Sequence, residues 1–289
     1  MKNAKVIDLI NETQDKFKKA DIETFELDAK ILIAHLLGLS DPEQIVFELN
    51  KKVSQEAYDK FISLVKRRLN FEPIAYIIGY KHFWKQVYKI NENVLIPRPE
   101  TELIVELILE KLQDRKNEKL CILDLGTGSG CIILSLLSEL KNSFGIGVDI
   151  SDKALDVAKS NANNLQLTER IEFVKSNWFD ALKKETKFDI IVSNPPYIAK
   201  NVWQNLPANV KNFEPSIALT NGRDGLKSYK IIAHCAKFFL KKDGIIVVEI
   251  GYNQKELVEN ILETQGYAIK FYKDLEGIYR VSVIIHTEE

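Results

Sequence analysis

The chain has 289 residues, 45% of them hydrophobic, and a formal net charge of −1. It is long enough for a large and a small domain and lacks the chain-wide positive charge of a nucleic-acid binder, although a local basic patch stays open. Four scattered histidines and three cysteines without a C-x-x-C pair predict no metal site, and with neither a signal segment nor a membrane-spanning run we expect a soluble, cytoplasmic protein without membrane contact.

The first part of the chain, residues 1–73, is predicted to be a small all-helical domain. Apolar side chains recur at helical spacing over residues 6–17 and 27–37, and Gly38 ends the second of these helices. A third helix is expected over residues 54–69. The charges are mixed, which fits either a solvated helical bundle or a docking module for a macromolecular partner.

A change of pattern at Pro73 predicts a second segment. Residues 74–95 are rich in aromatic and β-branched side chains punctuated by turn residues, so we expect a β-hairpin that links two domains. Residues 95–102 then carry two prolines, which stiffen the entry to a helix predicted over residues 103–112.

The remaining domain, residues 96–289, alternates strand and helix from Lys119 onward, which is typical of a parallel sheet. The fold class predicted is therefore α/β, with a seven-stranded, mostly parallel, doubly wound sheet that ends in a hairpin. The strands are expected at residues 120–124, 144–149, 171–175, 188–193, 244–250, 267–272 and 277–286.

A glycine-rich loop follows the first of these strands and opens a helix. Its residues are Gly126, Thr127, Gly128, Ser129 and Gly130. Glycines let the backbone approach a ligand closely at a helix N-terminus; a tight turn without a ligand is the alternative. The G-x-G-x-G spacing differs from the G-x-G-x-x-G of dinucleotide sites.

Two further strand ends carry candidate ligand contacts. Asp149 lies about twenty residues beyond the loop, the distance at which an acid meets ribose hydroxyls; a helix N-cap is the alternative, but Ser151 or Asp152 can serve there. Trp178 can pack against an adenine ring or belong to the core, and Asn177 can bond the ring edge. Together these residues indicate an adenosyl cofactor site.

The segment Asn194, Pro195, Pro196, Tyr197 follows the apolar strand 188–193. Neither proline can donate to a strand ladder, so the strand stops there. Asn194 is thereby placed at the carboxyl end of a strand, where open α/β sheets bind ligands. A mere turn is the alternative.

These motifs, in this order, resemble the S-adenosylmethionine-dependent methyltransferase fold of the amino-N-methylating group. Further stretches resemble the release-factor glutamine N5-methyltransferase family (HemK/PrmC-like). The matching stretches are residues 74–79, 83–84, 95–102, 124–130, 214–215, 224–226 and 249–251, with Asp274, Gly277 and Arg280.

The resemblance implies transfer of a methyl group from S-adenosylmethionine to the side-chain amide nitrogen (N5) of the glutamine in the Gly-Gly-Gln motif of peptide chain release factors. It implies that residues 1–73 recognise this substrate. The implied cofactor-binding residues are Gly126, Thr127, Gly128, Ser129, Gly130, Asp149, Trp178 and Asn194. Asn194, Pro195, Pro196 and Tyr197 are implied to bind the substrate, and Asn194, Pro195 and Tyr197 to be catalytic.

Asn194 and its neighbours have the groups needed to orient a planar amide. An amide NH2 has two donors, which the Asn194 side-chain carbonyl and the Pro195 backbone carbonyl can accept. The two prolines stiffen this geometry, and Tyr197 can stack on the planar amide. Because the methyl donor is already activated, alignment matters more than a general base.

Two other functions remain open from sequence. N6-adenine methylation of nucleic acid uses a similar planar amine, but it requires base flipping and strong phosphate binding, and no basic domain for this is evident, so no direct nucleic-acid substrate is expected. A non-catalytic adaptor is the second. Two roles remain open for Arg98, Glu214 and Arg280. Each can be structural, as an ion-pair partner or loop anchor, or each can contact the ligand or substrate.

Overall fold

The computed structural model describes residues 4–222 and 224–286. The chain divides into two compact units, one of Met1–Gly79 with Pro207–Phe213 and the other of Tyr80–Leu206 with Glu214–Glu289. Within the described residues, no helix has the length and apolar character needed to cross a bilayer.

The first unit is helical, as predicted. Gly38 adopts a left-handed φ of 69° and ends the second helix, and the Ser54 hydroxyl accepts a hydrogen bond from the Ala57 amide at the start of the third. Apolar side chains such as Phe17, Leu32 and Phe61 are buried between the helices. The elements are α1 (Val6–Lys19), α2 (Phe25–Leu37), η1 (Pro42–Phe47), α3 (Gln55–Leu69), α4 (Ile74–Ile78) and α9 (Ala208–Lys211).

A buried ion pair crosses this helical core. Arg68 Nε on α3 lies 2.7 Å from Asp28 Oδ2 on α2, and both side chains are less than 10% exposed. The Thr24 hydroxyl also donates to Asp28 Oδ2, at 2.8 Å. Since an isolated charge is costly in a core, each partner depends on the other.

The β-hairpin is confirmed but is shorter than predicted. Strands β1 (Tyr80–Phe83) and β2 (Gln86–Lys89) pair antiparallel. The expectation of β structure from residue 74 is wrong for Ile74–Ile78, which form helix α4. Ile77 packs into the helical core of the first unit, and this tertiary packing outweighs the β propensity of the isoleucines. Gly79, with a φ of 81°, ends the helix.

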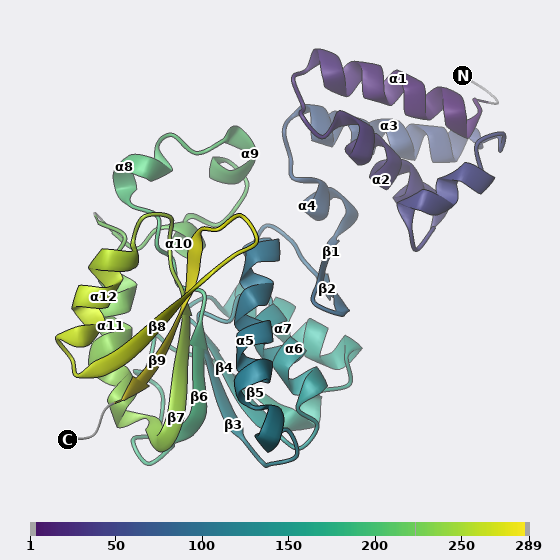
Figure 1. Cartoon of the computed structure of the whole chain (residues 1–289). Helices are drawn as coiled ribbons and strands as arrows, with labels where there is room; N and C mark the ends of the chain where they lie inside the picture. Colours follow the sequence, from purple (N-terminus) through teal and green to yellow (C-terminus); the bar gives the residue numbers. More distant parts are fainter. Residues whose placement is uncertain (1–3, 223, 287–289) are drawn as a thin grey trace. The chain divides into compact units, whose positions relative to one another are not determined.

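The second unit contains the predicted seven-stranded sheet, in the order β5-β4-β3-β6-β7-β9-β8 (Figure 1). The first five strands in this order, β5, β4, β3, β6 and β7, are parallel to one another, and β9 runs antiparallel to both of its neighbours. The α/β fold class is therefore confirmed. The strands are β3 (Cys121–Leu125), β4 (Phe144–Asp149), β5 (Ile171–Lys175), β6 (Phe188–Ser193), β7 (Leu240–Glu249), β8 (Tyr267–Lys273) and β9 (Tyr279–His286).

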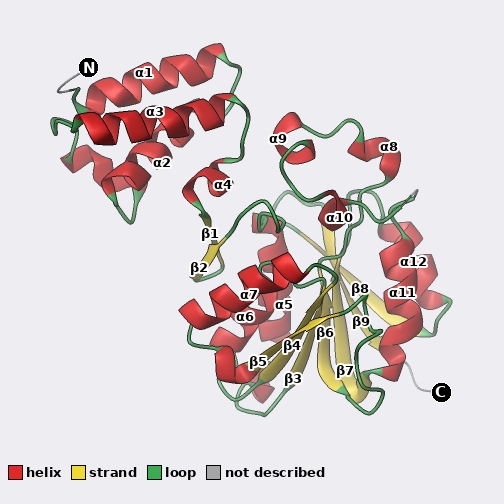
Figure 2. Ribbon diagram, turned by 180° about the vertical axis from the view of Figure 1, so that it is seen from behind, coloured by secondary structure: helices red, strands yellow, loops and turns green. Residues whose placement is uncertain are grey.

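Helices cover both faces of the sheet (Figures 1 and 2). Helices α5 (Glu102–Lys111), α6 (Cys131–Glu139) and α7 (Asp152–Asn164) lie on one face, and α11 (Lys227–Cys235) and α12 (Lys255–Glu263) lie on the other. The remaining short helices are η2 (Pro99–Thr101), η3 (Gln113–Arg115), η4 (Thr168–Arg170), α8 (Lys200–Trp203), α10 (Ser216–Leu219) and η5 (Ala236–Phe238).

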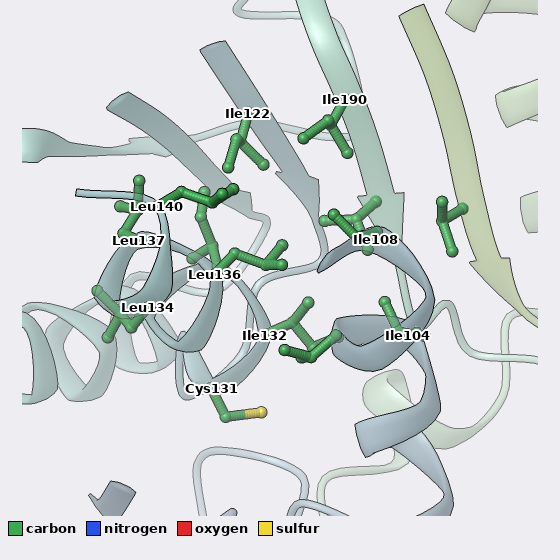
Figure 3. Packing of buried hydrophobic residues seen from close by; sticks show 14 of the residues in the cluster. Ile104, Ile108, Ile122, Cys131, Ile132, Leu134, Leu136, Leu137, Leu140 and Ile190 are labelled. Carbon is green, nitrogen blue, oxygen red and sulfur yellow. The ribbon is translucent and has the colours of Figure 1, made fainter. Parts of the chain in front are cut away.

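Successive side chains of the central strands point alternately into the two hydrophobic cores, one on each face of the sheet. Ile122 and Ile190 pack beneath α5 and α6, with Ile104 and Leu136 among their neighbours (Figure 3). Leu123 and its paired residue Ile191 face the opposite core, with α11 and α12. Successive side chains of a strand point to opposite faces, so a strand buried on both sides is apolar throughout.

The order of the strands reverses at the centre of the sheet. From β3 the chain proceeds outward to β4 and β5, and then returns to β6 on the other side of β3. The loops that leave the carboxyl ends of β3 and β6 therefore diverge to opposite faces. In open α/β sheets, ligands bind in the crevice at this position.

We expect Arg68→Ala to lower the free energy of unfolding of the helical unit by about 3 kcal/mol, because Asp28 would stay buried without its cation. Urea unfolding followed by circular dichroism measures this loss. Lys66→Ala removes an exposed cation from the same helix and is expected to change stability by less than about 0.5 kcal/mol. Equal effects of the two variants would contradict a stabilising role of the pair.

Candidate active site

A cavity of about 280 Å³ lies at the carboxyl edge of the sheet. Its walls include Gly126 and Gly128 after β3, Asp149 at the end of β4, Trp178 after β5 and Asn194 after β6. Four strand ends thus contribute predicted site residues to one cavity. Strand order alone predicts that these residues lie near one another, and in the structure they all line this cavity.

Strand pairing explains why these residues meet. Leu125 pairs with Val148 on one side and with Ser193 on the other. The next residues along the chain, Asp149, Gly126 and Asn194, therefore lie in one row at the carboxyl ends of β4, β3 and β6. The row continues to β7, because Ser193 pairs with Val248 and Glu249 comes next. Sequence analysis matched Glu249 to a family stretch without giving it a role.

The glycine loop has the backbone conformation that its glycines allow. Gly126, Gly128 and Gly130 have φ angles of 72°, 54° and 78°, in the left-handed region that other residues rarely adopt. A Cβ added at Gly126 would meet no protein atom within 4 Å, so the space beside it is open. At Gly130 a Cβ would lie 3.0 Å from Leu134 Cδ1, so this glycine packs closely against the side chains at the start of α6.

Thr127, Ser129 and Gly130 do not line the cavity. The Thr127 hydroxyl donates to Asp124 Oδ2 at 2.7 Å, and the Ser129 backbone carbonyl accepts a hydrogen bond from Asn161 Nδ2 at 2.9 Å. Both residues are buried. Their contacts hold the loop in place from behind, whereas Gly126 and Gly128 form the surface toward the cavity.

Asn161, in the last turn of α7, joins two segments that are distant in sequence. Its Oδ1 accepts from the Lys89 amide at 2.8 Å, and its Nδ2 donates to the Lys89 carbonyl at 3.1 Å as well as to Ser129. The hairpin strand β2 and the glycine loop are thereby tied to one side chain. Sequence analysis missed Asn161, since an asparagine within a helix gives no signal of its distant partners.

Asp149 is held by two backbone amides. Its Oδ2 accepts from the Gly128 amide at 3.0 Å, and its Oδ1 accepts from the Ser151 amide at 2.9 Å. Ser151 caps α7 through the Ala154 amide, so the capping role that was the alternative for Asp149 belongs to Ser151. Each carboxylate oxygen keeps acceptor capacity toward the cavity. Burial raises the pKa of Asp149.

Trp178 combines the two roles considered for it. The side chain packs partly against the core on the side of α11 and α12, and it also lines the cavity. Its φ of 57° is left-handed, a conformation that costs on the order of 1 kcal/mol for a large side chain. The Ser176 hydroxyl supports this turn by donating to the Trp178 carbonyl at 2.8 Å. Asn177 also lines the cavity, and its amide donates to Asp180 Oδ2.

Asn194 belongs to a chain of hydrogen bonds behind the cavity wall. Its Nδ2 lies 3.1 Å from Thr101 Oγ1, and the Thr101 hydroxyl donates to Glu249 Oε2 at 2.6 Å. The Tyr197 hydroxyl donates to the other oxygen, Glu249 Oε1, at 3.1 Å. Among the described residues, Asn194 Oδ1 has no hydrogen-bond partner, and Asn194 lines the cavity.

The other residues of this loop differ in their exposure to the cavity. Pro196 lines it, whereas Pro195 and Tyr197 do not. The Tyr197 ring packs against the core around α11 and α12, while its hydroxyl contacts Glu249. Tyr197 is therefore held by the protein itself and is not part of the cavity wall. The loop is also fixed through its carbonyls, because Ser228 Oγ donates to Pro196 and Gln254 Nε2 donates to Tyr197, both at 3.0 Å.

Two fully buried carboxyl groups flank the site. Burial raises the pKa of both Asp124 and Glu249 to about 7. The hydrogen bonds from Thr127 to Asp124, and from Thr101 and Tyr197 to Glu249, oppose the shift without cancelling it. Burial and the nearby Glu249 carboxyl also raise the pKa of Tyr197, so its hydroxyl keeps its proton.

Arg98, Glu214 and Arg280 form structural contacts outside the cavity wall. Arg98 Nη2 lies 2.5 Å from Glu214 Oε1, and the buried Glu214 also accepts a hydrogen bond from the Ile96 amide. Arg280 Nε lies 2.8 Å from Asp274 Oδ2, within the β8–β9 hairpin. These contacts agree with the structural roles that the sequence left open for the three residues.

We expect Asn161→Ala to lower the free energy of unfolding by about 2 kcal/mol, because it leaves the Lys89 and Ser129 backbone groups without their partner. Chemical denaturation measures the effect. Asn163→Ala lies in the same helix with its side chain exposed and serves as the matched control. If both variants lost the same stability, the three hydrogen bonds of Asn161 would carry no special weight.

The raised carboxyl pKa values predict that stability falls as the pH rises. In the folded state Asp124 and Glu249 titrate near 7 instead of at the ordinary 3.8 and 4.5, so their stabilising contribution is complete below about pH 4 and is lost as the pH passes about 7. We expect the free energy of unfolding to decrease from about pH 4 to about pH 7 and to level off above that. Asp124→Asn should reduce this decrease, whereas Asp156→Asn, on the exposed side of α7, should leave it unchanged; the opposite pattern would refute the assignment.

Comparison with known proteins agrees with this architecture. The PrmC N-terminal domain family matches residues 8–79, and a methyltransferase domain family matches residues 116–279. The structure of the N-terminal domain of human METTL16 in complex with SAH superposes with a TM-score of 0.54, at 19% identity, over 88% of this chain and 94% of that one. At this identity the likeness concerns the fold alone.

Several similar proteins align with this chain over most of its length. The release factor glutamine methyltransferase of Caulobacter vibrioides is 38% identical over 93% of this chain and 92% of its own length. That of Fusobacterium nucleatum is 37% identical over 96% of this chain and 78% of its own length. The bifunctional methyltransferase of Rickettsia typhi is 41% identical over 94% of this chain, which spans just over half, 56%, of that longer relative. The resemblance deduced from the motifs is thus confirmed: the chain contains a methyltransferase domain and belongs to the release factor glutamine methyltransferase family.

Proposed function

We propose that this protein transfers a methyl group from S-adenosylmethionine to the side-chain amide nitrogen (N5) of the glutamine in the Gly-Gly-Gln motif of peptide chain release factors. Release factors are then its protein partners and the cytoplasm its compartment. The observation that carries the proposal is the position of Asn194. Its Nδ2 is bound to Thr101, which leaves Oδ1 to accept a hydrogen bond from an amide NH2 in the cavity.

The cavity fits an adenosyl ligand. Gly126 and Gly128 leave open space beside the loop, and Asp149 offers carboxylate oxygens at the distance along the chain expected for ribose hydroxyls. Trp178 offers an aromatic surface for a flat base. These residues, together with Asn194, would hold the cofactor, while Thr127, Ser129 and Gly130 would support the loop from behind.

When bound, S-adenosylmethionine supplies a methyl group on a positively charged sulfur, which is already activated for transfer. The residues of the chain therefore act mainly by alignment. Asn194 Oδ1 and the Pro195 carbonyl accept the two N–H groups of the glutamine amide, which orients the nitrogen lone pair. Among the described residues no backbone amide donates to the Pro195 carbonyl. Pro195 itself does not line the cavity, so Asn194 Oδ1 is the acceptor that the cavity wall presents.

The step balances without a tuned general base. The nitrogen–methyl bond forms as the sulfur–methyl bond breaks, and the nitrogen then loses one proton to water. The hydrogen bonds to Asn194 and Pro195 place electron density on the nitrogen before transfer. Rigid prolines and the hydrogen bonds from Ser228 and Gln254 keep these acceptors in position, so little ordering is needed at the moment of reaction.

The helical unit is the proposed docking module for the release factor. It corresponds to the segment matched by the PrmC N-terminal domain family. This choice between a docking module and a plain solvated bundle rests on the family relationship, because the helices contain no motif of their own.

The proposal is tested with the purified chain, labelled S-adenosylmethionine and unmethylated release factor, and mass spectrometry of the product locates the methyl group. We expect the label on the glutamine amide, and none in a release factor whose Gly-Gly-Gln glutamine is replaced by alanine. Asn194→Ala should reduce the rate by about 100-fold or more, while the exposed Asn163→Ala should not. Label in DNA offered in parallel, with none in the release factor, would sink the proposal in favour of adenine methylation.

A further inference from the structure

We propose that Thr101 and Glu249 are positioning residues that decide which end of the Asn194 side-chain amide faces the cavity. This inference rests on the proposed function, because an amide NH2 substrate needs the carbonyl end of Asn194. Neither residue touches the cavity. Both would act through Asn194, across a chain of hydrogen bonds.

This series of hydrogen bonds joins three elements of the fold. Asn194 follows β6, Glu249 ends β7, and Thr101 lies immediately before α5. The three side chains are linked in series by contacts of 3.1 Å and 2.6 Å. Thr101 is 2% exposed and Glu249 is fully buried, so solvent cannot readily replace a lost partner.

The number of protons available fixes the direction of the hydrogen bonds between Asn194, Thr101 and Glu249. An ionised carboxylate only accepts hydrogen bonds, and a hydroxyl has a single proton to donate. The Thr101 proton is therefore committed to Glu249, as is the Tyr197 proton. Thr101 Oγ1 can then only accept from Asn194, which requires the NH2 end of the amide. The carbonyl end, Oδ1, is left for the cavity.

Protonation of Glu249 removes this constraint. A protonated carboxyl can donate to Thr101, whose own proton is then free to point at Asn194. The Asn194 amide can turn over and present its NH2 group to the cavity. An NH2 group there would face the N–H groups of the substrate amide, donor against donor, and the alignment for methyl transfer would be lost.

The surroundings of Glu249 make such a change accessible in an ordinary pH range. No salt bridge reaches its carboxyl among the described residues; Arg280 favours the ionised form from a distance while Glu100 opposes it. Tyr229 donates to the backbone carbonyl of Glu249, and the Cys131 thiol lies within its electrostatic reach. Burial dominates and raises the pKa of Glu249 to about 7.

A buried carboxyl without a salt bridge is costly to keep. An apolar residue in the same place would avoid this cost, but it could not fix the direction of the chain. The hydroxyl of Thr101 is equally specific, because a valine of the same shape would leave both Asn194 Nδ2 and Glu249 Oε2 without a partner.

The first test observes Asn194 directly, without substrate. In the full chain with 15N-labelled asparagine, the Asn194 side-chain signals are assigned by their absence in Asn194→Asp. We expect these signals to shift with one titration near pH 7, and the titration to disappear in Glu249→Gln. Signals that do not move between about pH 5 and pH 9 in the unaltered protein would overturn the proposal.

The second test follows turnover at saturating S-adenosylmethionine, with release factor as substrate. We expect kcat to fall about tenfold for each pH unit below about 7, and Glu249→Gln to abolish this acid limb. Thr101→Val should lower kcat by about 100-fold with little change in cofactor affinity measured by calorimetry, and Thr101→Ser should restore most of the rate. A Thr101→Val variant that stays folded and retains full kcat would overturn the proposal.

The two tests separate this inference from the function on which it rests. If the Asn194 signals titrate as expected and no release factor is methylated, the hydrogen-bond chain is supported and the proposed function fails. If methylation occurs and the acid limb persists unchanged in Glu249→Gln, the function is supported and the positioning role fails.

Discussion

The parallel pairing of β3 with β6 is the constraint on which the site depends. Leu125 lies opposite Ser193, and the Ser193 hydroxyl donates to the Leu125 carbonyl at 2.7 Å. A shift of one residue would turn every side chain of β6 to the other face, exchanging the two hydrophobic cores. The register is therefore set by burial on both faces. The row of strand ends that forms the site follows from that register without further adjustment.

The site is surrounded by charges that oppose folding. Asp124, Asp149 and Glu249 all lie at or near this edge of the sheet, and burial raises the pKa of each. Backbone amides and hydroxyl groups stabilise them in place of cations, so the carboxyl groups stay available as acceptors. Such an arrangement stabilises a particular geometry more than it stabilises the fold, which is typical of functional sites.

Much of this architecture could be predicted from sequence because local rules and global fold agree. The strands of the parallel sheet are apolar throughout, the glycine loop needs left-handed backbone, and two prolines can only follow a strand that has ended. Helix α4 was missed because three isoleucines favour a strand locally, whereas Ile77 is buried in a helical core that a single segment does not reveal.

The partners of Asn161 and Thr101 could not be predicted for a different reason. Asn161 contacts a residue 72 positions away, and Thr101 contacts one 148 positions away. Side-chain hydrogen bonds over such separations depend on the final packing of elements and leave no periodic trace in the chain. The residues proposed to touch a ligand thus gave clearer sequence signals than the residues whose side chains hold them in place.

The structure gives Tyr197 a different contact from the one that its sequence position predicts. As a stacking residue it would contribute only apolar contact with a planar group. With its hydroxyl on Glu249 and its ring in the core, it instead holds one oxygen of the carboxyl that Thr101 holds at the other. Both donors stabilise the ionised form of Glu249. The Asn-Pro-Pro-Tyr segment therefore holds, within four residues, the proposed acceptor for the substrate and a hydroxyl that donates to the carboxyl proposed to orient that acceptor.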